Sequence, residues 1–174
     1  SGSYLEYANL TNTNLSGANL SKTVLTHATL HKTNLTKVNL SDANLGASDF
    51  YQAQVIDSNL TNALLGKSAI RQSMFQRCKM AEKMDLFLET QFQETSFIDC
   101  DMRQLVFIDA DISGSEFIEC DLTKSSFLNP VANRVKFTGS KLNGVTFVNI
   151  VGSEANFDGA EMEKVGFVGG ADLI

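Results

Sequence analysis

A large apolar residue recurs at every fifth position along most of this 174-residue chain. A Leu-rich run extends from Leu5 to Met80, and a Phe-rich run extends from Phe87 to Phe167. A small or mid-sized residue stands two positions before most of these centres, and Asn often lies between the two. A repeat this short constrains the whole fold, because the same local structure must form at every unit.

A period of five matches neither the 3.6-residue period of a helix nor a sustained alternation of two. Within each unit, however, the paired apolar positions are two residues apart, so both side chains face the same side of a short extended segment. The other three residues face outward and turn the corner. A chain that turns after every five residues must coil, and stacked coils pair as parallel strands, each contacting only its neighbours. The single proline, Pro130, is consistent with this extensive backbone pairing.

Units such as Ala8-Asn9-Leu10-Thr11-Asn12 and Ala43-Asn44-Leu45-Gly46-Ala47 resemble the pentapeptide-repeat motif A(D/N)LXX, and the resemblance covers nearly the whole chain. It implies an all-β fold, a single right-handed quadrilateral β-helix with four units per coil. The spacing of Cys100 and Cys120 independently supports a twenty-residue coil. About 34 units would make about eight coils and a rod roughly 40 Å long, at about 4.8 Å per layer.

We expect one continuous rod over residues 4–174. The rod is expected to begin at residue 4 because Ser1-Gly2-Ser3 has the composition of a tag remnant. The phase slips by two residues between Met80 and Phe87, which predicts a loop or bulge near 81–86. Two later centres, Ala132 and Gly152, are irregular.

The sequence offers little chemistry. It has no glycine-rich phosphate loop, nucleophile elbow or zinc-binding spacing. His27 and His31 fall on outward positions in a region without carboxylates nearby, and we interpret them as surface residues. Cys78, Cys100 and Cys120 share one inward column once the slip is counted. We interpret them as small core hydrophobes rather than metal ligands, although a disulfide between layers is sterically conceivable. We therefore expect no enzymatic activity, no cofactor and no metal.

The net charge of −6 is unevenly distributed, because residues 1–80 carry +3 and residues 81–174 carry −9. Twenty-residue stacking gathers an acidic patch made of Asp99, Asp101, Glu116, Glu119 and Asp121. One interpretation is a solvated face, and the other is a surface that imitates a nucleic-acid backbone. The latter resembles family members that protect type II topoisomerases from quinolones and look like DNA mimics. This sequence departs from them at Lys136 and Lys141, in its positive first half, and in ending in repeat sequence at Leu173 rather than in a pairing helix.

A second outward feature is apolar. The position after each centre faces outward, and one such column reads Leu88, Ile108, Leu128, Val148 and Val168, each twenty residues apart. An exposed apolar column of this size is typical of a contact surface. Two alternatives remain open: these residues simply suit an extended segment, or a flanking segment covers them.

The most specific hypothesis is a non-enzymatic protein-interaction module or scaffold, part of a larger bacterial protein. The alternatives are a DNA-mimicking protein that binds a type II topoisomerase and a purely structural spacer. We expect a protein partner or self-association through the apolar face, and no direct nucleic-acid binding. We expect no membrane association, because no apolar stretch approaches about 18 residues. The odd number of cysteines argues against a disulfide framework and favours a reducing compartment, so we expect the cytoplasm.

Overall fold

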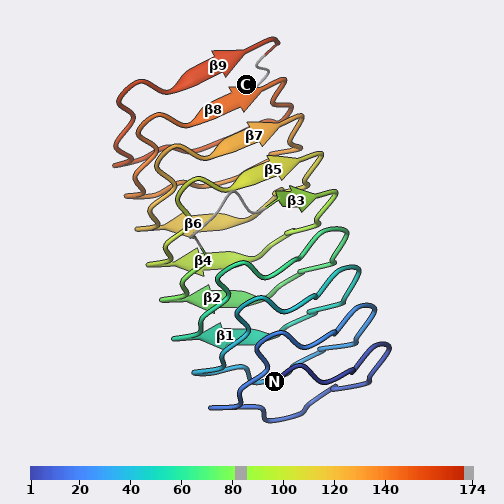
Figure 1. Ribbon diagram of the computed structural model, residues 1–174. Helices are drawn as coiled ribbons and strands as arrows, with labels where there is room; N and C mark the ends of the chain where they lie inside the picture. The colour runs from blue at the N-terminus through green and yellow to red at the C-terminus, as the bar shows by residue number, and fades with distance from the viewer. Residues whose placement is uncertain (81–85, 171–174) are drawn as a thin grey trace.

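The chain winds into a solenoid whose turns stack along one axis, with the first described turn at one end and the last at the other (Figure 1). The computed structural model describes residues 1–80 and 86–170, and this part of the chain contains no helix. Neighbouring turns pair in parallel, and the partners are twenty residues apart, as in Asn9 with Thr29 and Ser96 with Glu116. Four five-residue units therefore complete one turn, and the predicted quadrilateral β-helix is confirmed.

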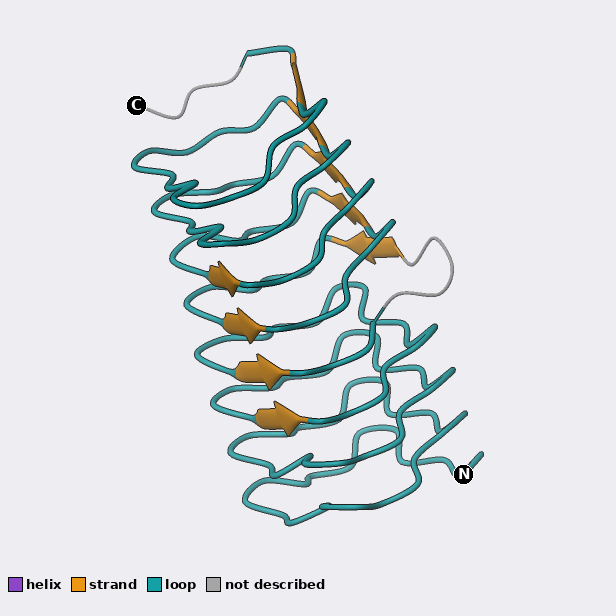
Figure 2. Ribbon diagram, turned by 90° about the vertical axis from the view of Figure 1, so that its left-hand side faces the viewer, coloured by secondary structure: helices purple, strands orange, loops and turns teal. Residues whose placement is uncertain are grey.

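Within the described residues, three-residue strands form two parallel sheets on opposite sides of the coil (Figure 2). The four-stranded sheet consists of β1 (Gln54–Ile56), β2 (Met74–Gln76), β4 (Ser96–Ile98) and β6 (Glu116–Ile118). The five-stranded sheet consists of β3 (Leu86–Leu88), β5 (Val106–Ile108), β7 (Ser126–Leu128), β8 (Thr146–Val148) and β9 (Gly166–Val168).

The five-stranded sheet thus has regular strands in about five turns of the solenoid. The number of units in the sequence predicts roughly eight coils. Single-residue bridges continue the same stacking into the N-terminal half, where Tyr4, Val24, Asn44 and Leu64 pair in succession. The difference lies in the length of each side. Outside the two sheets, each side of a turn pairs through a single residue, in the N-terminal turns and on the remaining faces of the later turns.

The corners follow one rule. The residue two positions after each centre adopts a left-handed conformation, with φ of 51° at Asp99 and 62° at Lys67. The Asn or Asp before the centre supports many of these corners, because its side-chain oxygen accepts a hydrogen bond from the backbone N–H two residues later. Asn9 accepts from Thr11 at 3.0 Å, and Asp111 accepts from Ser113 at 3.0 Å. This bond explains the polar residue of the motif.

The core consists of columns of like side chains, Leu in the first half and Phe in the second. The Phe107 ring stacks on Phe87 and Phe127, with centroid distances of 4.9 and 4.4 Å. Inward Ser and Thr hydroxyls donate to backbone carbonyls of the preceding turn, as Ser140 does to Phe117 at 2.9 Å. These hydrogen bonds allow small polar residues to share the apolar interior.

Pairing steps by 22 residues instead of twenty where it crosses residues 81–85, as in Met74 with Ser96 and Lys79 with Asp101. The steps return to twenty afterwards. The loop predicted near 81–86 itself lies almost entirely outside the described residues. At the other end, the N–H of Gly2 donates to the carbonyl of Ser21 at 2.9 Å, so the stacking already includes a residue of the expected tag remnant.

The irregular centres Ala132 and Gly152 lie against each other in neighbouring turns. Gly152 is buried directly over Ala132, and a Cβ atom on Gly152 would lie 2.5 Å from the carbonyl carbon of Ala132. The backbone of this face therefore approaches the turn below closely. Only glycine at position 152 permits that approach.

Candidate interaction surfaces

The apolar column lies in register on the outer surface of the five-stranded sheet. Pairing places Leu88 beside Ile108, Ile108 beside Leu128, and continues through Val148 to Val168. The preceding residue of each strand is a Phe that points into the core, so the aliphatic side chain points outward. The first four members are half-buried between their neighbours, and Val168 is 54% exposed.

Strand propensity accounts for only part of this column. Aliphatic residues also follow the centres of β1, β4 and β6 on the opposite sheet, where they suit the extended conformation. Gln76, however, occupies the same position in β2, which remains a regular strand. The backbone conformation therefore does not require an aliphatic side chain, and five in succession exceed what strand formation needs.

Oppositely charged edges flank the column. At the corner that follows it, Glu89 and Asp109 form an acidic edge, which Asn129 and Asn149 continue. Side-chain hydrogen bonds link this edge, because Asn129 donates to Asp109 at 2.9 Å and Asn149 donates to Asn129 at 3.0 Å. Glu89 also lies 3.9 Å from the ammonium of Lys67.

The corner that precedes the column carries positive charge. Its left-handed positions are Gln104, Lys124, Gly144 and Lys164, and all four are exposed. Lys124 and Lys164 are therefore the basic edge. The five-stranded sheet thus presents an aliphatic centre between edges of opposite charge.

The acidic patch is less negative than its sequence suggests. Asp101 pairs with Asp121 between layers, and Asp99 and Glu119 are twenty residues apart on the adjoining corner. The guanidinium of Arg103 makes two 2.7 Å hydrogen bonds to Asp101, and its Nε lies 3.9 Å from Asp121. These contacts hold the pKa of Asp101 below its usual range. Arg103 therefore lies between Asp101 and Asp121 and offsets part of the repulsion between these stacked acids.

Other cations reach the remaining part of the patch. Lys136 forms a 2.7 Å ion pair with Glu116. A depression of about 350 Å³ is lined by Asp99, Asp101, Glu119 and Asp121 but also by Arg103 and Lys141. In the part of the chain that the structure describes, no group of three or more His, Cys, Asp or Glu side chains is arranged to hold a metal ion.

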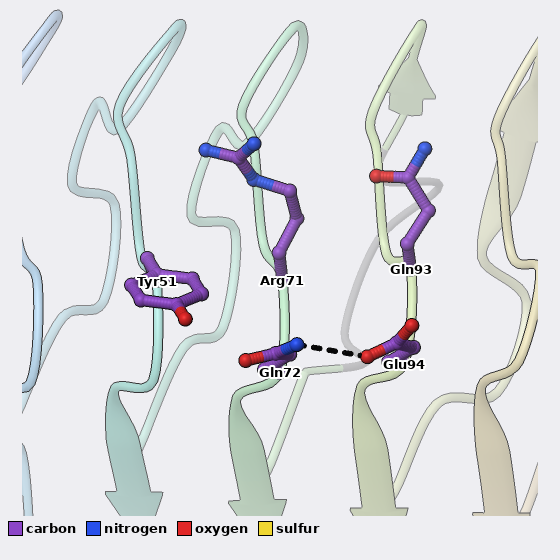
Figure 3. A pocket seen from close by; sticks show the side chains of 5 residues that line it. All are labelled: Tyr51, Arg71, Gln72, Gln93 and Glu94. Atoms are coloured by element: carbon purple, nitrogen blue, oxygen red, sulfur yellow. Dashed lines mark hydrogen bonds between the residues drawn. The ribbon is translucent and has the colours of Figure 1, made fainter.

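A second depression, of about 370 Å³, is polar. Its lining residues are Tyr51, Arg71, Gln72, Gln93 and Glu94 (Figure 3). The Gln72 amide donates to the Glu94 carboxylate of the adjacent layer at 2.9 Å, as the dashed line in Figure 3 shows. Arg71 also donates to Asp49 at 3.2 Å and Gln93 donates to Asp111 at 2.6 Å, so most of the polar groups around the depression already have a partner in the protein.

The interpretation of His31 as remote from carboxylates is wrong. Its Nε2 atom lies 2.9 Å from Oδ2 of Asp49, and the Arg71 guanidinium approaches the same oxygen at 3.2 Å. Twenty-residue stacking places Asp49 in the turn next to His31. His27 instead stacks on Tyr7, with ring centroids 4.8 Å apart.

The three cysteines form the predicted inward column, and all are free and buried. Each thiol lies near a carbonyl of the preceding turn, at 3.2 Å for Cys78, 3.4 Å for Cys100 and 3.3 Å for Cys120. The neighbouring Cys100 sulfur and burial raise the pKa of the Cys78 and Cys120 thiols. All three thiols are therefore small packing groups of the core, each held against a backbone carbonyl.

Two models of known protein families match the chain. The model described as "Pentapeptide repeat region" matches residues 68–147, and that described as "Pentapeptide repeats (8 copies)" matches residues 3–42 and 133–165. The chain belongs to the pentapeptide-repeat family. Together these matches extend over both halves of the solenoid. No curated protein matches the sequence.

Solved structures of the family are similar over most of their length. A trypsin-treated variant of QnrB1, a plasmid-mediated fluoroquinolone resistance protein, is 12% identical with a TM-score of 0.56, covering 96% of this chain and 92% of that one. HetL of the cyanobacterium Nostoc, involved in heterocyst differentiation regulation, is 14% identical with a TM-score of 0.40, covering 95% and 87%. At these identities the likeness to QnrB1 concerns the fold alone. Within residues 1–80 and 86–170, no helix could cross a membrane.

Proposed function

We propose that this pentapeptide-repeat rod is a non-enzymatic protein-interaction module that binds through the outer face of its five-stranded sheet. The observation that carries the proposal is the uninterrupted aliphatic column from Leu88 to Val168, held in register by backbone pairing. Evenly spaced aliphatic side chains on a straight sheet suit a partner surface that is itself regular.

The energies are sufficient for a specific but modest interface. Complete burial of a Val, Leu or Ile side chain contributes about 1.5 to 3 kcal/mol relative to full exposure. Four of the five residues are already half-buried, so each would gain only part of that amount. Association also costs several kcal/mol in lost translational and rotational freedom. The column alone thus supports a weak complex, and polar contacts at the edges must add to it.

The arrangement of the most reactive side chains supports binding rather than catalysis. The thiols are buried against carbonyls, and His31 is paired with Asp49. Free, reduced cysteines also suit a reducing compartment, so we extend the proposal to the cytoplasm.

Photo-crosslinking in cells that produce the protein tests this function. A photoreactive amino acid replaces Ile108, and the matched control replaces Thr138, which follows a centre on the opposite face. We expect a discrete adduct from position 108 and none from position 138. The combined change Ile108→Lys and Leu128→Lys, with the probe at Val148, should abolish the adduct while lowering the melting temperature by only a few degrees. Absence of an adduct from position 108, or severe unfolding of the double variant, would overturn the proposal.

A DNA-mimicking protein that binds a type II topoisomerase is the second candidate. The fold likeness to the fluoroquinolone resistance protein QnrB1 favours it. The cations Arg103 and Lys136 weaken it, because they neutralise part of the acidic patch. A binding assay with purified topoisomerase tests it directly. If the wild-type rod binds, changing Asp99, Asp101, Glu119 and Asp121 to their amides should abolish binding, whereas lack of wild-type binding excludes this candidate.

A further inference from the structure

We infer that the occupant of the five-stranded face is a second copy of this chain, docked face to face about a two-fold axis parallel to the rod. The inference rests on the proposed function, because it names the partner of the same surface. It follows from the even spacing of the aliphatic column and from the opposite charges of the two edges beside it.

The column is suited to its own copy. Its members recur once per layer, at about 4.8 Å, and the face spans about 19 Å over four layer spacings. A second copy has the same spacing, and a two-fold axis along the rod keeps every layer at its own height. Each aliphatic side chain can therefore pack beside its counterpart in the same layer of the other copy, along the whole column. Two sheets packed in this way lie about 10 Å apart, the usual separation in a sheet-on-sheet core.

The charged edges determine the orientation. A two-fold axis along the rod carries the acidic edge, Glu89 and Asp109, to the basic edge of the other copy, Lys124 and Lys164. A two-fold axis across the rod reverses the partner and places each edge opposite the same edge of the other copy. Opposite charges favour the first arrangement, and like charges disfavour the second. The two rods should therefore lie parallel, with their N-termini at the same end.

One ion pair across the interface is specific enough to test. Lys124 belongs to the turn of β7, one layer along the rod from Asp109, which belongs to the turn of β5. In the parallel dimer these residues lie on facing edges, and the flexible four-carbon stem of lysine spans one layer. The two-fold axis makes the contact twice. Glu89 is a poorer choice because it is already near Lys67.

Both positions tolerate charge reversal in the monomer. Asp109 and Lys124 are exposed corner residues with φ of 52° and 62°, a conformation that acidic and basic residues both adopt elsewhere in this chain. Lys67 and Asp99 are examples. Thermal melting of each variant verifies that the rod remains folded.

Sedimentation equilibrium of the wild type, Asp109→Lys, Lys124→Asp and the double variant tests the inference. We expect a concentration-dependent wild-type dimer, dissociation constants raised at least about 10-fold by each single reversal, and recovery to within about 3-fold in the double variant. Arg134→Asp, an exposed change at a left-handed corner that does not border the five-stranded face, is the control and should leave the constant unchanged.

Each alternative outcome has a separate meaning. A dimer that the single reversals leave unchanged or strengthen overturns the parallel arrangement but leaves the proposed function standing. A wild-type chain that remains monomeric at every concentration overturns the second copy as partner. In that case, an adduct from position 108 to another protein still upholds the proposed function, and no adduct removes both.

Discussion

At the scale of single residues, close backbone approach rather than side-chain burial determines what position 152 can accommodate. Substitution of Gly152 by Ala should force the backbone away from Ala132, because the new Cβ atom would lie 2.5 Å from a carbonyl carbon. Overpacking of this kind costs about 1 to 3 kcal/mol, measurable by urea denaturation. Gly166→Ala is the control, since its Cβ atom would meet Thr146 at an ordinary 3.8 Å. Equal effects of the two changes would contradict this account.

Arg103 offers a second test at this scale. The hydrogen bonds from Arg103 lower the pKa of Asp101 in the folded state. Ionised Asp101 therefore stabilises the fold at pH values above the ordinary Asp pKa of about 3.9. This stabilisation is lost as the pH falls through the lower pKa that Asp101 has in the folded state. Arg103→Gln should raise the pKa of Asp101 in a carboxyl NMR titration and reduce the loss of stability on acidification. Lys136→Gln should leave the Asp101 titration unchanged. The same result in both variants would contradict the role of Arg103.

At the scale of elements, the Phe columns hold the five-stranded sheet together. Phe107 is fully buried and stacks on rings above and below, whereas Phe167 is 42% exposed and stacks on Phe147 on one side. Phe107→Ala should therefore lower the free energy of unfolding by about 3 to 5 kcal/mol. Phe167→Ala should lower it by clearly less, since less surface leaves the core. Chemical denaturation of both variants measures the difference, and equal losses would contradict the column interpretation.

The column pattern was predictable, whereas contacts between long side chains were not. Leu and Phe centres and the cysteine column follow from the five- and twenty-residue periods, because backbone pairing keeps like positions in line. The contact of His31 with Asp49 and the ion pairs of Arg103 with Asp101 and Asp121 depend on which rotamers reach the neighbouring carboxylates. The twenty-residue period places Asp49 in the turn next to His31, two positions from the residue that stacks on it, so this contact was within reach of the sequence. The period does not show that Arg103 reaches both acids.

At the scale of the whole molecule, each turn contacts only its neighbours, so complete turns should be removable. Deleting residues 26–45 joins Leu25 to Gly46 and reproduces the existing junction between Leu45 and Gly46. Every later unit then keeps its face, because the deletion equals the twenty-residue pairing step. We expect a folded rod that is shorter by about 4.8 Å and only moderately less stable.

Deleting residues 26–43 instead removes eighteen residues and shifts all later units by two relative to Leu25. Leu45 would then fall on a left-handed corner and Ser48 on the next inward centre, so the core columns would be broken unless two residues were absorbed elsewhere. The natural step of 22 near residues 81–85 adds two residues to one turn, whereas this deletion leaves a turn two residues short, which cannot form a bulge. Circular dichroism melting and small-angle X-ray scattering should therefore show a folded rod for the twenty-residue deletion and a largely unfolded N-terminal region for the eighteen-residue deletion. Equal stability of the two variants would mean that the faces of the coil are interchangeable and that the twenty-residue register does not govern folding.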